Sequence, residues 1–174
     1  LSLLMAGTMS VCISGGDVWA ENTVKLTSDT VYNVIGEIPA SIEMNGHNII
    51  SNVMLNADNA GLSIIGTDME NLTINGEGLQ FAVAAQSSSN AKVLISNVKK
   101  VDITGNVIND SLLHSNINGA IIFDKVGLFN ITTEKSIGLH AQGGLIYIDA
   151  DAVSIKSKDE NAIWAQLSNC SGDY

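Results

Sequence analysis

Short apolar segments recur along this chain at a nearly constant spacing, and this repeat limits the folds that the chain can adopt. The central residues of the segments are Leu26, Ile50, Ile74, Ile103, Ile131 and Ile155, at successive separations of 24, 24, 29, 28 and 24 residues. Repeats of this period are typical of solenoids, propellers and arrays, in which each unit buries its apolar face against its neighbours. The sequence therefore predicts about six copies of one structural unit.

The interior of each repeat predicts three short strands. One repeat contains largely apolar triplets at 72–74, 81–83 and 93–95, and the next contains them at 101–103, 112–114 and 121–123. Several triplets alternate apolar and polar residues, as a strand with one buried face does. No segment sustains the apolar period of a helix. We therefore predict an all-β parallel β-helix with three short strands per coil, and a β-propeller or an irregular sandwich is the alternative.

The residues between the strands favour the same fold. Asn75-Gly76 and the stretch 86–90 are rich in residues that tolerate positive φ or bond their own backbone. In a β-helix, equivalent strands of neighbouring coils pair in parallel about 4.8 Å apart. Asparagines beside the strands are then expected to stack into amide ladders. The candidates are Asn45, Asn71, Asn75, Asn97 and Asn130.

Length and charge restrict the class of partner. The chain has 174 residues, enough for one domain with its own core. Its formal net charge is −10, and its largest basic cluster is Lys99-Lys100. Because nucleic-acid binding relies on neutralisation of phosphates by Lys and Arg, this balance argues against a nucleic-acid partner.

Residues 1–20 have the pattern of a secretory signal peptide. Residues 1–14 are apolar and almost uncharged, and Val18 and Ala20 occupy the −3 and −1 positions of a cleavage site before Glu21. The apolar stretch of roughly 13 residues is too short to span a bilayer, which needs about 20. Cys12 would leave with the signal, and a lipoprotein anchor through Cys12 is the alternative. We predict a signal peptide at 1–20 and an exported domain at 21–174 that continues beyond this chain.

Several segments resemble bacterial autotransporter passenger domains. Residues 42–50, Ile-Glu-Met-Asn-Gly-His-Asn-Ile-Ile, are similar to the opening coil of that family. The segments 71–76, 101–106 and 152–155 resemble its recurrent first strand, and 137–141 its short second strand. The resemblance covers residues 24–166. It implies a right-handed, pectin-lyase-like β-helix, export to the bacterial cell surface or beyond the outer membrane, and a translocator barrel in the full-length protein.

Acidic residues were compared with the needs of the pectinolytic enzymes and phage tailspikes that share this fold. Asp149 and Asp151 lie near one bend, and Asp159 and Glu160 one bend later, so all four acids could share one side. A solvated turn face is the favoured interpretation, with a calcium site or a catalytic site as alternatives. The chain contains no Arg to clamp a uronate or phosphate. The triplet Asp68-Met69-Glu70 is interpreted as another solvated turn.

The three histidines give no recognisable metal spacing. His114 and His140 follow equivalent strands and are expected to stack on neighbouring coils, whereas His47 lies in an early coil. A zinc site would need a third ligand or a spacing such as His-x3-5-His. We interpret the pair as bend or surface histidines, with a metal pair as the alternative. The sequence thus assigns no catalytic, cofactor-binding or metal-binding residue, and no cofactor.

The function expected from these observations is binding without catalysis. A stack of coils exposes long polar faces suited to extended contact. We expect a secreted or surface-displayed adhesin or display scaffold, whose partner is a host-cell or matrix ligand of protein or glycan, with no membrane insertion of the mature segment. The alternatives are a β-helical polysaccharide lyase or hydrolase, and a structural stalk for a module encoded outside this chain.

Overall fold

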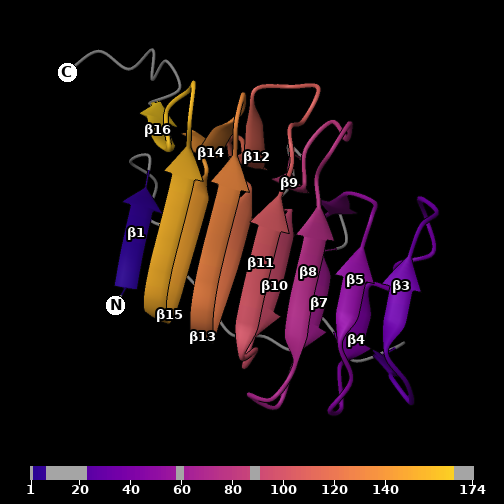
Figure 1. Cartoon of the computed structure of the whole chain (residues 1–174). Coiled ribbons are helices and arrows are strands. Elements are labelled where there is room, and N and C mark those ends of the chain that lie inside the picture. The colour runs from indigo at the N-terminus through magenta and orange to yellow at the C-terminus, as the bar shows by residue number, and fades with distance from the viewer. Residues whose placement is uncertain (1, 7–22, 58–60, 87–90, 167–174) are drawn as a thin grey trace.

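The computed structural model describes residues 2–6, 23–57, 61–86 and 91–166, and all regular structure in them is β-strand. The strands wind into a parallel β-solenoid with three faces (Figure 1). The described residues contain no helix long and apolar enough to cross a bilayer.

Each face is a stack of equivalent strands from successive coils. The first face holds β2 (Thr23–Lys25), β4 (Ser41–Glu43), β7 (Leu62–Ile65), β10 (Lys92–Ser96) and the first halves of β13 (Ala120–Thr133) and β15 (Leu145–Ser157). The second face holds β3 (Thr30–Tyr32), β5 (Ile49–Ser51), β8 (Asn71–Asn75), β11 (Lys100–Thr104) and the second halves of β13 and β15. The third face holds β6 (Leu55–Asn56), β9 (Val83–Ala85), β12 (Ser111–Ser115), β14 (Ile137–Gln142) and β16 (Ile163–Gln166).

The described strands make about five complete turns, preceded by the partial turn of β2 and β3. Neighbouring coils pair in parallel and in register on every face, for example Lys92 with Ala120 and Leu113 with Leu139. The predicted all-β parallel β-helix with three strands per coil is confirmed. It forms because each strand is too short to bury its apolar side chains except between two neighbouring coils.

The predicted core column is present over its last four members. Ile103 pairs with Ile74 on one side and Ile131 on the other, and Ile131 pairs with Ile155. Ile74, Ile103 and Ile131 are fully buried, and Ile155 in the last coil is partly buried. Equivalent inward positions of successive coils thus lie above one another, as the repeat predicts.

The first two anchors were placed wrongly. Ser51 occupies the column position beside Ile74, while Ile50 points outward and is 43% exposed. Leu26 is buried but follows β2 on the first face. The cause is coil length: Thr23 pairs with Ser41, so the first coil spans only 18 residues, and a constant step of 24 shifts the register.

The corner between the first and second faces uses left-handed backbone. Asp68, Asn97 and Lys125 have φ of 68°, 53° and 54° in three successive coils. Asp and Asn adopt this conformation more readily than other non-glycine residues. Lys125 lies where the pairing of β13 with β15 shifts between Phe123 and Val126, so it marks a bulge that turns β13 from one face to the next.

The asparagines join coils in short pairs. The Asn71 backbone nitrogen and its Nδ2 donate to Oδ1 of Asn48 at 2.8 and 3.2 Å. The Asn130 amide donates instead to Asp102. Stacking of amides between coils is therefore local, because the coils differ in length at their turns.

The strand β1 (Ser2–Ala6) pairs antiparallel with β15, from Ser2 opposite Asp149 to Ala6 opposite Leu145. Part of the predicted signal peptide therefore forms an edge strand in this chain. The predicted cleavage site after Ala20 lies outside the described residues, so the processing step stays a prediction.

Candidate functional site

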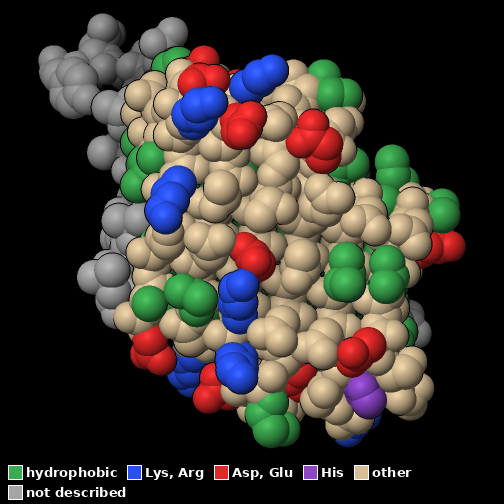
Figure 2. Space-filling model, viewed as in Figure 1, with side chains coloured by type: hydrophobic (Ala, Val, Ile, Leu, Met, Phe, Trp, Pro, Cys, Tyr) green, Lys and Arg blue, Asp and Glu red, His purple; other side chains and the backbone are tan. Residues whose placement is uncertain are grey.

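A row of polar side chains runs along the outside of the second face. Thr73, Asp102, Asn130 and Ser154 occupy the same outward position in four successive coils. Figure 2 shows this side of the molecule, where most side chains are neither hydrophobic nor charged and the charged groups are scattered. The face offers polar groups at a regular spacing of about 4.8 Å.

Asp102 is the charged member of this row. It accepts hydrogen bonds from Lys100 Nζ at 2.8 Å and from Asn130 Nδ2 at 2.7 Å. Partial burial raises the pKa of Asp102, but the hydrogen bonds from Lys100 and Asn130, with the Lys100 charge, lower it further, so the pKa lies below its ordinary value. The carboxylate is thus ionised and held in place on the surface.

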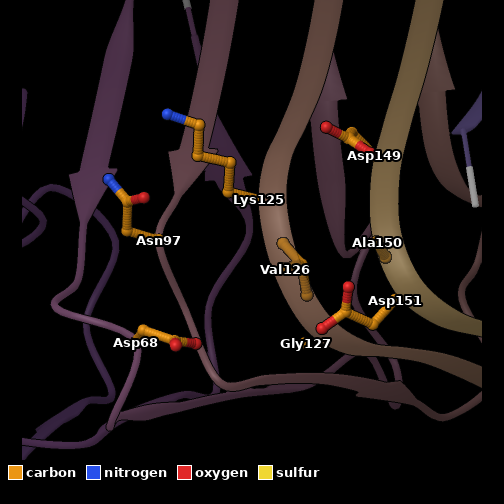
Figure 3. A pocket seen from close by; sticks show the side chains of 8 residues that line it. All are labelled: Asp68, Asn97, Lys125, Val126, Gly127, Asp149, Ala150 and Asp151. Carbon is orange, nitrogen blue, oxygen red and sulfur yellow. The ribbon is translucent and has the colours of Figure 1, made fainter.

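A pocket of about 310 Å³ lies at the corner between the first and second faces (Figure 3). Its lining comes from four successive coils and consists of Asp68, Asn97, Lys125, Val126, Gly127, Asp149, Ala150 and Asp151. Three carboxylates and one amine therefore meet there. Figure 3 shows the amine of Lys125 pointing away from Asp149 and Asp151, so the pocket contains acids and a base without bringing them together as a pair.

The four acids considered together in the sequence do not share one side. Asp149 and Asp151 line the pocket, whereas Asp159 and Glu160 lie in the turn between β15 and β16. The second half of β15 separates the two pairs, and the Asp159 nitrogen donates to the Glu134 carbonyl at 2.9 Å in the far corner. The long strand β15 puts successive bends at opposite edges of the second face.

The third face carries a cluster of one carboxylate and two imidazoles. His114 on β12 and His140 on β14 are register partners, as expected from their equivalent strands. Asp110, just before β12, lies between them: its Oδ2 is 2.8 Å from His140 Nδ1 and its Oδ1 is 3.8 Å from His114 Nδ1. One ligand atom of each of the three residues lies within 4.8 Å of the others.

Aromatic rings enclose the two imidazoles. Phe81 stacks on His114 with ring centroids 4.6 Å apart, and Trp164 stacks on His140 at 5.0 Å. The two imidazoles meet edge to face at 5.1 Å. Both histidines are buried, while the Asp110 side chain is 45% exposed. The cluster is therefore closed on the sides of the rings and open on the side of the carboxylate.

The environment favours neutral His114. Burial lowers its pKa, the nearby Asp110 charge raises it, and His140 lowers it, with a net decrease. Ser111 Oγ donates to Asp110 Oδ1 at 3.0 Å and lies 3.4 Å from His114 Nδ1. The buried Nε2 of His140 has no hydrogen-bond partner among the described residues. The arrangement can act chemically as a nitrogen and oxygen ligand set.

Sequence reasoning missed the third member of this cluster. The search required His-x3-5-His spacing, and Asp110 precedes His114 by four residues as part of a turn. The signal that could have found it is an acid just before one of two stacked histidines. His47 lies apart from the cluster, 3.7 Å from Asp29 through Nδ1.

The interpretation of Asp68-Met69-Glu70 as a solvated turn is wrong for Glu70. Asp68 and Met69 are exposed, but Glu70 is only 1% exposed. Its carboxylate accepts hydrogen bonds from the turn around it, so burial is compensated.

Comparisons with protein-family models, with curated proteins and with solved structures gave no significant match. The parallel β-solenoid is thus established by the structure of this chain. The resemblance to autotransporter passenger domains remains an expectation from the sequence segments that carry it.

Proposed function

We propose that this chain is part of an exported, surface-displayed β-helical protein that acts by binding, as an adhesin or display scaffold. The contact surface is the outward side of the second face. The observation that carries the proposal is the row of Thr73, Asp102, Asn130 and Ser154, repeated coil by coil on a surface of mostly uncharged polar groups.

Such a surface suits an extended partner. A regular row lets a polypeptide or glycan make the same weak contact with several coils, and the contacts add along the row. The row continues into Ile50 and Val31, which are 43% and 51% exposed and add apolar contact at one end. The partner is a ligand of a host cell or matrix, a protein or a glycan, and not a nucleic acid, given the net charge of −10.

Charge insertion on the face tests the proposal. The double variant Thr73→Lys/Thr132→Lys places two long cations on the outside of the second face, because both residues point away from the core. Binding of the labelled chain to host cells, extracellular matrix proteins and a glycan array is expected to weaken at least about tenfold.

The matched control adds the same charge elsewhere. Asn109→Lys/Gln166→Lys alters two exposed residues away from the second face, and its binding is expected to stay near that of the parent. Circular dichroism confirms that both doubles fold. Equal losses in the two doubles, or no binding of the parent to any of these surfaces, would overturn the proposal.

A polysaccharide lyase or hydrolase is the second candidate, favoured by the corner pocket with its three carboxylates and Lys125. Acid and base catalysis needs groups within hydrogen-bond reach of one reacting atom. Because Lys125 points away from Asp149 and Asp151, we expect no turnover of acidic or neutral polysaccharides.

Two matched double variants separate the candidates. Asp149→Asn/Asp151→Asn changes the pocket, and Asp159→Asn/Glu160→Gln removes two acids at the far corner. Release of reducing ends or unsaturated products by the parent that only the first double abolishes would establish the enzyme and defeat the adhesin proposal.

A further inference from the structure

We propose that Asp110, His114 and His140 form a binding site for one divalent transition-metal ion with the ligand preferences of zinc. The site lies on the third face and goes beyond the proposed binding function of the second face. It would tie the turn before β12 to the neighbouring strand β14.

The distances between the ligand atoms match a metal site after small movements. Four tetrahedral ligands with bonds of about 2.1 Å are separated from one another by about 3.4 Å. The observed distances from Asp110 to His140 and His114, 2.8 and 3.8 Å, lie on either side of that value. All three ligand atoms lie within 4.8 Å, so an ion between them needs shifts of about 1 Å or less.

Hydrogen bonding alone satisfies this cluster incompletely. The Asp110 carboxylate reaches His140 Nδ1 at hydrogen-bond distance but is too far from His114 Nδ1. Ser111 directs its hydroxyl proton to Asp110 at 3.0 Å, so at 3.4 Å it cannot also donate that proton to His114. A cation bound to both Nδ1 atoms would satisfy both imidazoles with one carboxylate.

A second observation is the state of His140. The residue is 4% exposed, and its Nε2 has no partner among the described residues. Metal-bound imidazoles carry the proton on the nitrogen that does not bind the ion. Coordination through Nδ1 would therefore make Nε2 a donor, which a water molecule entering beside Asp110 or a polar group outside the described part could accept.

The surroundings hold the ligands in position. Phe81 and Trp164 stack on the outer sides of the two imidazoles and limit their rotation. Ser111 fixes the carboxylate through its hydrogen bond to Oδ1. Contacts of this kind orient metal ligands and typically change affinity 10–100-fold when lost. The exposed Asp110 leaves a route for the ion from solvent.

The ligand types select the ion. Two imidazole nitrogens and one carboxylate suit zinc and its neighbours in the first transition row, whereas calcium and magnesium prefer sites built of oxygen alone. Three protein ligands leave a fourth position for water or for a group from a partner. The geometry thus fits Zn²⁺ or Co²⁺ and disfavours Ca²⁺.

The test uses the full 174-residue chain carrying Cys12→Ser and Cys170→Ser, because free thiolates also bind zinc. The protein is treated with chelator, dialysed and titrated with ZnCl₂ by calorimetry, and with CoCl₂ while visible absorption is recorded. We expect one ion per chain and the absorption bands of cobalt with nitrogen and oxygen ligands.

Three variants locate the site. Asp110→Asn and His140→Gln remove one ligand each, and His47→Gln removes the histidine that lies beside Asp29. The first two are expected to weaken Zn²⁺ binding at least about tenfold and to abolish the cobalt bands, while the third retains both. If His140→Gln fails to fold, Asp110→Asn at the exposed edge of the cluster carries the comparison.

Nuclear magnetic resonance gives an independent readout. Zinc is expected to shift the ring signals of His114 and His140 and to leave those of His47 in place. The proposal is overturned if the parent binds no Zn²⁺ or Co²⁺, if Asp110→Asn binds as tightly as the parent, or if the shifts occur at His47.

Discussion

The Glu70 carboxylate accepts a hydrogen bond from the backbone nitrogen of Gly46 at 2.6 Å, although 24 residues separate them in the chain. The same carboxylate accepts bonds from the nitrogen and hydroxyl of Thr67 and from the Met69 nitrogen. Burial raises the pKa of Glu70, but these donors outweigh it and bring the pKa down to about 2. One buried carboxylate thus fastens a turn to the preceding coil.

Replacing this carboxylate should destabilise the solenoid. In Glu70→Gln an NH₂ group replaces one acceptor oxygen, so at least one backbone nitrogen loses its partner, and we expect a loss of about 2–4 kcal/mol in the free energy of unfolding. Urea unfolding at neutral pH measures it. The exposed Glu37→Gln is the control and should change stability by less than about 0.5 kcal/mol.

The contribution of Glu70 should also depend on pH with a defined sign. Its pKa is lower in the folded chain than the ordinary value of 4.5, so its stabilisation is fully present above that value and is lost as the pH falls toward about 2. The shift corresponds to ~3 kcal/mol. The difference in unfolding free energy between the parent and Glu70→Gln should therefore shrink between about pH 5 and pH 2. A difference that is constant over this range would contradict the assignment.

The isoleucine column should not accept a charge. Ile103 is fully buried between Ile74 and Ile131, so Ile103→Asp buries an unpaired carboxylate at a cost of several kcal/mol, at least about 3. The neighbouring Thr104→Asp places the same group on the outward side and should cost about 1 kcal/mol or less. Thermal unfolding followed by circular dichroism compares them, and equal losses would contradict the proposed register.

Relief of backbone strain should stabilise the first corner. Lys125 has φ of 54°, whereas the equivalent corner one coil earlier has Asn97 at 53°. Because Asn tolerates this region better, Lys125→Asn should raise the unfolding free energy by about 0.5–1 kcal/mol. Lys135→Asn, at an exposed residue without positive φ, is the control and should give no gain. A lower melting temperature for Lys125→Asn would show that the lysine side chain matters more than the strain.

Export should remove the first twenty residues. When the chain is produced in a secreting bacterium, sequencing of the exported protein should start at Glu21, and Ala20→Leu should block the cut because the −1 position requires a small residue. Cleavage would also remove β1 and free the Leu145–Asp149 edge of β15. An exported protein that still begins at Leu1 would refute the predicted signal peptide.

The sequence predicted those features that depend on local pattern. The alternation around Ile74, Ile103 and Ile131 identifies inward positions, because a strand between two coils needs apolar residues there. Ile50 was misplaced because the early coils are shorter, and only the pairing of strands reveals their length.

The site features could not be predicted for a related reason. The roles of Glu70 and Asp110 depend on which atoms of one turn meet the next coil. Gly46 lies 24 residues before Glu70, and His140 lies 30 residues after Asp110. Turn lengths vary from coil to coil, so such meetings follow from the register in space and not from a fixed spacing in the chain.

The in-register stacking of coils sets how far this protein can reach. Each coil advances the axis by about one strand spacing of 4.8 Å. The later coils use 24 to 29 residues for that step, as the pairing of Leu72 with Val101 and of Phe129 with Val153 shows. An extended chain of the same length would reach roughly 80 Å. The architecture therefore exchanges reach for a wide, stiff wall, which suits the display of a surface better than the spanning of a distance.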